Sequence, residues 1–167
     1  MSKAEFIGLV RGVNLNCVVD IRSVPRSRHN PQFGRAEMER WLPAADVAYR
    51  WEVAIGGFRK VSPTSPNVAL RHPAFRGYAD YMLTDEFSAA IDELLQSSGD
   101  VLTAVMCSES VWWRCHRRLV SDYLTLIRGI EIRHLMHDGT LREHPLTEGV
   151  RAAGQVVLYD MLPTPSA

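Results

Sequence analysis

Residues 107–118, with the sequence CSESVWWRCHRR, gather many of the side chains in this chain that could do chemistry. The segment holds two cysteines, one histidine, one glutamate, two tryptophans and three arginines. A cysteine thiolate is a nucleophile, and neighbouring arginines stabilise that anion. Guanidinium groups and the amides at the start of a helix also bind phosphate. The segment is therefore a candidate for a reactive thiol, a metal site or an anion cradle.

Cys107 is the strongest nucleophile candidate, because it closes the apolar run VLTAVM just before a cationic helix start. Its spacing to Arg114 is one residue too long for the phosphate loop of cysteine phosphatases, and no glycine lies between them. Zinc binding by Cys107, Cys115 and His116 would need ligand spacings unlike those of structural zinc sites. We therefore predict a nucleophile or an anion site here, and no metal. Cys115 shares the apolar stripe of Leu119 and Tyr123, so we expect its side chain to point inward.

The elements that must position these residues alternate between helix and strand along the chain. Apolar periodicity predicts helices over 4–12, 35–42, 78–83, 85–96 and 117–127. Short apolar or β-branched runs predict strands over 17–21, 47–51, 101–106 and 130–135. This alternation predicts a single α/β domain over residues 1–167, with three layers and a mostly parallel β-sheet flanked by helices. No element is predicted after Thr147.

Polar residues follow three of the predicted strands. Asp20 and Arg22 follow the first, Cys107 and Glu109 follow the third, and His134 ends the last. Ligands of such sheets bind beyond the carboxyl ends of the strands. We therefore predict one site there, with Asp20 or Glu109 as general acid or base and Cys107 as nucleophile. Arg22 and Arg117 would clamp an anion, and Arg114 would support it.

Charge and composition limit the classes of function. The formal net charge is zero, which argues against a general polyanion binder. Two intervals, 21–36 and 53–79, contain arginines but no acid, so positive charge is gathered locally. The sequence contains no run of 18 or more apolar residues, so it predicts no membrane span. Three cysteines and no signal peptide predict a cytoplasmic protein with free thiols.

Four ordered motifs resemble the domain of unknown function 488 family: DIRSVPRSRHNPQF, FRGYADYM, MCSESVWWRCHRRLVSDYL and IRHLMHDGTLREH. The resemblance covers about residues 4–144. It implies an α/β fold and no particular activity. The resemblance also implies a strand before helix 4–12, which the sequence as printed lacks. Finally, it implies a shared polar set, which corresponds to Asp20, Arg22, Pro25, Ser27, Asn30, Pro31, Gly57, Tyr78, Cys107, Glu109, Cys115, His116 and Arg117.

Together these observations predict an intracellular enzyme, or a degenerate enzyme, that binds a small anionic ligand of the phosphate or nucleotide type. The ligand-binding residues we expect are Arg22, Ser27, Asn30, Tyr78, Arg114, His116 and Arg117. The alternative is a non-catalytic nucleic-acid-binding module, in which the loop arginines contact phosphates and Trp112 or Trp113 stacks on a base. The sequence names no cofactor, substrate or oligomeric state.

Overall fold

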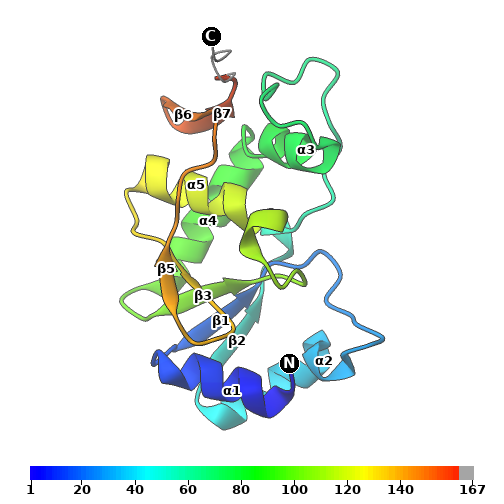
Figure 1. Cartoon of the computed structure of the whole chain (residues 1–167), viewed down its shortest axis with the longest axis vertical. Helices are drawn as coiled ribbons and strands as arrows, with labels where there is room; N and C mark the ends of the chain where they lie inside the picture. The colour runs from blue at the N-terminus through cyan, green and yellow to red at the C-terminus, as the bar shows by residue number, and fades with distance from the viewer. Residues whose placement is uncertain (162–167) are drawn as a thin grey trace. The chain divides into compact units, whose positions relative to one another are not determined.

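The computed structural model describes residues 1–161, which combine helices with short strands (Figure 1). The α-helices are α1 (Lys3–Gly12), α2 (Arg35–Trp41), α3 (Pro73–Tyr81), α4 (Asp85–Ser98) and α5 (Arg117–Arg128). The strands are β1 (Cys17–Asp20), β2 (Ala48–Trp51), β3 (Thr103–Met106), β4 (Arg133–Leu135), β5 (Leu141–Glu143), β6 (Val150–Ala153) and β7 (Val156–Tyr159). Four 3-10 turns complete the order: η1 (Pro31–Phe33), η2 (Pro43–Ala45), η3 (Val53–Ile55) and η4 (Trp112–Arg114).

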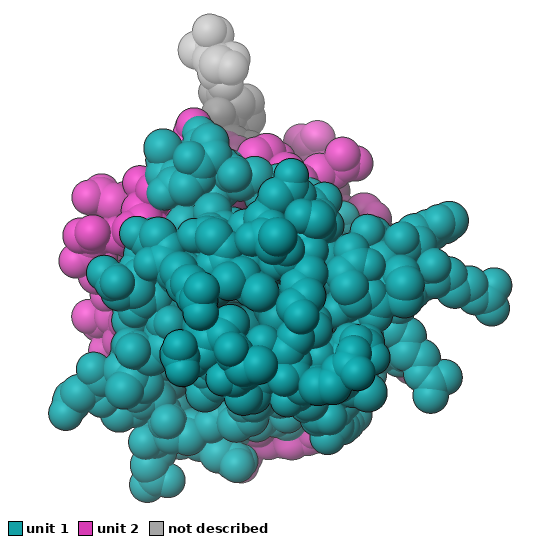
Figure 2. Space-filling view, turned by 90° about the horizontal axis from the view of Figure 1, so that it is seen from below, with its two compact units in different colours: residues 1–56, 90–110, 135–140 teal, residues 57–89, 111–134, 141–167 magenta. Residues whose placement is uncertain are grey.

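The chain folds into two compact units, which Figure 2 shows in teal and magenta. Unit 1 consists of residues 1–56, 90–110 and 135–140, and unit 2 holds the rest of the chain. Helix α4 contributes its first residues to unit 2 and the others to unit 1. The single domain predicted over residues 1–167 stays a prediction.

Unit 1 is built on a three-stranded parallel sheet in the order β2–β1–β3. Parallel strands bury both faces, and in β1 the three residues Val18, Val19 and Asp20 are all buried. Helices α1 and α2 pack on this sheet (Figure 1) around a core that includes Val10, Val18 and Trp41. Helix α1 begins in a capping box, because Ser2 accepts from the Glu5 amide and the Glu5 carboxylate accepts from the Ser2 amide.

The register of this sheet places two predicted site residues on neighbouring strands. Asp20 pairs with Met106 across β1 and β3, and the Ile21 amide donates to the Met106 carbonyl at 2.9 Å. Cys107 directly follows Met106. The parallel sheet confirms the coarse α/β prediction, whereas the predicted three-layer arrangement around a larger, mostly parallel sheet stays a prediction.

Unit 2 centres on helix α5, which packs with α3 and the β6–β7 hairpin. Leu119, Val120, Tyr123 and Leu124 form its buried stripe, as the periodicity predicted. The helix begins at Arg117, at the start of the predicted range 117–127. It begins no earlier because η4 ends at Arg114 and Cys115 adopts an extended backbone.

The β6–β7 hairpin was not predicted from the sequence. Its strands are antiparallel, with Ala153 opposite Val156, and Gly154 in the connecting turn has a φ of +65°. Two-residue hairpin turns favour glycine because such turns need positive φ. Gly154 followed by the β-forming run VVLY was thus an available signal. Strands β4 and β5 form a further two-stranded pair.

Candidate functional site

Asp20 and Arg22 form a buried ion pair in unit 1, with side chains 0% and 6% exposed. Arg22 Nε donates to Asp20 Oδ1 at 2.8 Å, and its Nη2 donates to Asp20 Oδ2 and to the Phe33 carbonyl. The Tyr49 hydroxyl donates to Asp20 Oδ2 at 2.6 Å. This arrangement joins β1 to β2 and to the loop before α2. The structure thus brings these two predicted residues together, and each side chain is already hydrogen-bonded to the other.

Electrostatics support this pairing. Burial alone would lower the pKa of the Arg22 guanidinium, but the hydrogen bonds and charge of Asp20 outweigh it and raise that pKa. Burial, together with the hydrogen bond to Asp20 and its negative charge, also raises the pKa of Tyr49. Tyr49 therefore stays protonated and remains a donor to the carboxylate.

The other predicted residues of unit 1 lie in separate turns. Ser27 Oγ accepts from the Asn30 amide at 3.0 Å, so these two residues share one turn before η1. Cys107 is half-buried, with its Sγ 3.9 Å from Ser108 Oγ, and Glu109 is exposed two residues further on. A cavity of about 570 Å³ follows the ends of β1 and β2, and its lining includes Arg26, Arg35 and Trp51.

Three predicted residues lie close together in unit 2. Cys115 is buried, with its Sγ 3.6 Å from His116 Nδ1, and the His116 ring packs 4.8 Å from the ring of buried Tyr78. Cys115 is buried, as expected from its spacing to Leu119 and Tyr123, although it lies two residues before α5 begins. Arg114 is exposed at the end of η4, and Arg117 is half-buried at the start of α5. The convergence of all predicted residues on one site stays a prediction, and so does the expectation that no metal binds there.

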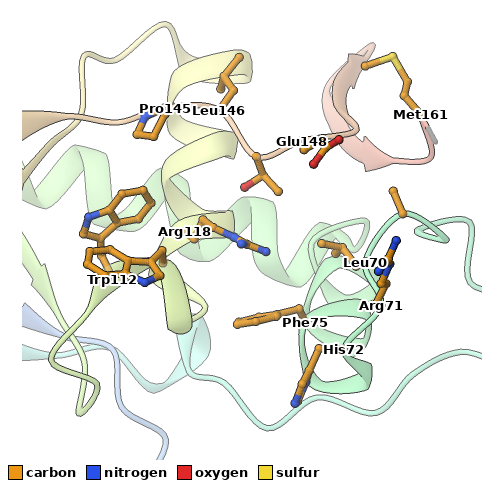
Figure 3. Close-up of a pocket in the computed structure, with 13 residues that line it drawn as sticks. Leu70, Arg71, His72, Phe75, Trp112, Arg118, Pro145, Leu146, Glu148 and Met161 are labelled. Atoms are coloured by element: carbon orange, nitrogen blue, oxygen red, sulfur yellow. The ribbon is translucent and has the colours of Figure 1, made fainter. Parts of the chain in front are cut away.

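A larger cavity of about 630 Å³, which was not predicted from the sequence, lies in unit 2 (Figure 3). Trp112 and Trp113 line it from η4, Phe75 from α3 and Arg118 from the first turn of α5. The remaining lining residues come from two loop segments and the end of the described chain: Ala69, Leu70, Arg71, His72, Pro145, Leu146, Thr147, Glu148 and Met161. The segment 107–118 thus supplies the cavity with Trp112, Trp113 and Arg118.

Two guanidinium groups at this cavity have no carboxylate partner among residues 1–161. Arg118 lies over the Phe75 ring at 5.0 Å, and Figure 3 shows both side chains pointing into the space between Trp112 and Leu70. Nε of Arg118 and Oγ1 of Thr147 are buried without a hydrogen-bond partner in that part of the chain. Arg71, on the opposite side, is exposed. Because Arg118 gives up no ion pair by turning toward a ligand, it is available to an anion.

The family comparison agrees with the resemblance seen in the sequence. The model of the family described as "Domain of unknown function DUF488" matches residues 2–124, which is most of the chain. The chain belongs to this family. The matched range covers the parallel sheet, η4 and the start of the cavity wall, and it ends inside α5. No curated protein and no solved structure matches the chain. No helix within residues 1–161 is both long and apolar enough to cross a membrane.

We predict that Cys107 reacts with iodoacetamide at least about tenfold faster than Cys115 in the folded protein, because thiol reactivity needs access to reagent. Cys115 is only 3% exposed, whereas Cys107 is half-buried. Cys17 should also react slowly, because burial raises its pKa against the opposing charge of Arg50. Timed alkylation near neutral pH with peptide mapping measures the three rates. Faster labelling at Cys115 would remove Cys107 as the nucleophile.

Proposed function

We propose that the protein binds a small anionic ligand of the phosphate ester or nucleotide type in the cavity of unit 2. The observation that carries the proposal is the lining of that cavity, where two indoles and a phenyl ring stand beside two guanidinium groups that no carboxylate of residues 1–161 pairs with. Ligand sites commonly combine apolar walls with a few placed polar groups. Arginine binds phosphate through its planar fork of donors, and a tryptophan face stacks on a planar ring.

The balance of charge at the cavity supports an anion rather than a cation. Arg71 and Arg118 contribute two positive charges, and Glu148 is the single acid of the described lining. In the unit 1 cavity, by contrast, Arg35 is already paired with Glu39 at 2.6 Å and stacked over Trp51. An arginine committed to a carboxylate is a weaker anion ligand. The unit 2 cavity is therefore the better candidate.

Catalysis remains a separate hypothesis within this proposal. Asp20 is held in its pair with Arg22, so general acid–base chemistry by Asp20 would require that pair to open. Cys107 and Glu109 keep their predicted roles as nucleophile and acid or base. Binding in the unit 2 cavity requires none of these three residues.

We expect adenosine 5′-monophosphate to quench the tryptophan fluorescence of the protein saturably. Replacing Arg118 with alanine should weaken this binding about 10- to 100-fold, since hydrogen bonds to charged groups contribute about 1.5–3 kcal/mol. Replacing Trp113 with alanine should weaken the binding of adenosine 5′-monophosphate more than the binding of inorganic phosphate, because only the nucleotide has a ring to stack. The matched control is Arg40→Ala on α2, where Arg40 pairs with exposed Glu37.

The same titration separates the nucleic-acid alternative. A backbone-binding module would bind a single-stranded oligonucleotide with affinity that falls steeply with salt, and it would bind the mononucleotide far more weakly. If the protein binds neither mononucleotide, nor phosphate, nor oligonucleotide, the proposal is contradicted. An unchanged affinity in Arg118→Ala would move the site away from this cavity.

A further inference from the structure

Behind the unit 2 cavity, two histidines extend a hydrogen-bonded series from a buried carboxylate. Asp122 in α5 is 0% exposed, and its carboxylate makes hydrogen bonds with three residues. His144 Nε2 lies 2.9 Å from Asp122 Oδ1, the Thr147 amide donates to the same oxygen at 2.9 Å, and the Tyr159 hydroxyl donates to Oδ2 at 2.9 Å. On its other side, His144 Nδ1 lies 3.0 Å from His134 Nε2. The hydrogen bonds therefore run in the order Asp122, His144, His134.

The hydrogen-bond directions in this chain follow from the carboxylate. An ionised carboxylate only accepts hydrogen bonds, so the proton between Asp122 and His144 belongs to His144 Nε2. In a neutral His144 the Nδ1 atom is then an acceptor, and the proton between the two rings belongs to His134 Nε2. This leaves Nδ1 of His134 as the unprotonated, basic end of the chain.

A positive charge is better placed on the inner ring than on the outer ring. Burial lowers the pKa of His134 to about 4, and positive charge on His144 and Arg117 adds to this effect, while Asp122 opposes it. His144 instead contacts the carboxylate directly. A further titratable neighbour of Asp122 is Tyr159, on β7. Burial raises its pKa, and Asp122 adds to the rise while Arg118 opposes it. Tyr159 therefore stays a neutral donor.

This hydrogen-bonded series contacts the cavity lining at two points. The indole of Trp112, which lines the cavity, stacks on the His134 ring at 3.8 Å with an angle of 2° between the planes. Thr147 also lines the cavity, and its amide is bound to Asp122. His134, His144 and Tyr159 all lie beyond residue 124, so this arrangement is outside the part of the chain that the family model matches.

We propose that Asp122, His144 and His134 form a proton relay behind the wall of the unit 2 cavity, in which a proton taken up at Nδ1 of His134 comes to rest on His144. Nδ1 of His134 gains a proton from solvent. The Nε2–H bond of His134 breaks as an Nδ1–H bond forms on His144. The product is an imidazolium beside the Asp122 carboxylate, and His134 is again neutral, in its other tautomer.

One consequence of the relay rests on the proposed function. An anion in the cavity adds negative charge close to the relay, which favours the protonated pair. Binding of a phosphate-type anion should therefore be accompanied by uptake of a proton, and affinity should rise as pH falls. The relay itself does not depend on the ligand and can be tested in the free protein.

The first experiment follows the imidazole ¹⁵N signals of the ligand-free protein as pH is lowered. We expect His144 to become the cation first, while His134 exchanges its protonated nitrogen from Nε2 to Nδ1 and stays neutral. A His144→Gln variant should abolish this tautomer change at His134. The amide side chain of that variant can still donate to Asp122 and accept from His134, but it cannot be protonated. Independent titration of the two histidines, or the same His134 behaviour in His144→Gln, would overturn the relay.

The second experiment measures binding of adenosine 5′-monophosphate by calorimetry in two buffers of different ionisation enthalpy, which gives the number of protons taken up. Wild-type protein should take up more protons per ligand than His144→Gln, and the ligand's own titration cancels in this comparison. His137→Gln, in an exposed turn, is the control and should match wild type. Equal uptake in wild type and His144→Gln would overturn the link to the anion.

The two experiments also separate failure of the relay from failure of the proposed function. A tautomer change at His134 in the free protein, combined with no nucleotide binding, would support the relay and contradict the anion site. Nucleotide binding without the tautomer change would do the reverse. A melting temperature of His144→Gln close to that of wild type would show that lost proton uptake does not come from unfolding.

Discussion

Replacing Arg22 with alanine is expected to lower the free energy of unfolding by about 3–5 kcal/mol, which is the usual cost of removing one partner of a buried ion pair. Asp20 is fully buried, so without Arg22 its charge would stay in the core beside Tyr49. Phe33 would also lose the guanidinium that its carbonyl accepts from. The measurement is chemical denaturation with a linear extrapolation to water.

Two comparisons test the origin of this loss. Arg40→Ala removes an arginine whose ion pair with Glu37 is exposed, and such pairs contribute only about 0–1 kcal/mol. Arg22→Lys keeps the charge but cannot reproduce the two-point contact with Asp20, so its effect should lie between those two variants. A loss below about 1 kcal/mol for Arg22→Ala would mean that Asp20 and Arg22 are not a structural pair, and it would return Arg22 to the list of available anion ligands.

A second large effect is expected from pH, because the folded protein resists protonation of His134. Its pKa is about 4 in the folded protein, against an ordinary value of 6.5. Between these two values the unfolded chain binds a proton that the folded protein does not. Stability from this residue is therefore fully present above about pH 6.5 and is lost as pH falls toward 4. The difference corresponds to about 3 kcal/mol.

The measurement is the free energy of unfolding at a series of pH values for wild type, His134→Gln and His137→Gln. Carboxylates also titrate near pH 4, so the informative quantity is the difference in slope between the proteins. His134→Gln should flatten the loss between pH 6.5 and 4, and exposed His137→Gln should follow wild type. Parallel curves for all three proteins would contradict a neutral, buried His134.

The burial of Cys115 shows what helical periodicity alone could and could not predict. The stripe shared by Leu119 and Tyr123 predicted that Cys115 points inward, and it is buried. Periodicity could not predict that η4 precedes α5, because a 3-10 turn of three residues leaves no repeating pattern. That turn decides which side chains of segment 107–118 reach the cavity, and these are the indoles rather than the thiols.

The sequence by itself determined the order of the main elements, the family and the neighbouring strand ends of Asp20 and Cys107. These follow from local patterns, since apolar spacing of 2 or 3.6 residues is readable within a short window. The hydrogen-bonded series of Asp122, His144 and His134 was decided only by the tertiary structure. Asp122 contacts His144, 22 residues later, and Tyr159, 37 residues later. No local sequence pattern links residues so far apart. Such contacts depend on how α5 packs on β6 and β7. Likewise, Arg22 looked like an anion ligand in the sequence, and only folding showed that Asp20, two residues away, already holds it.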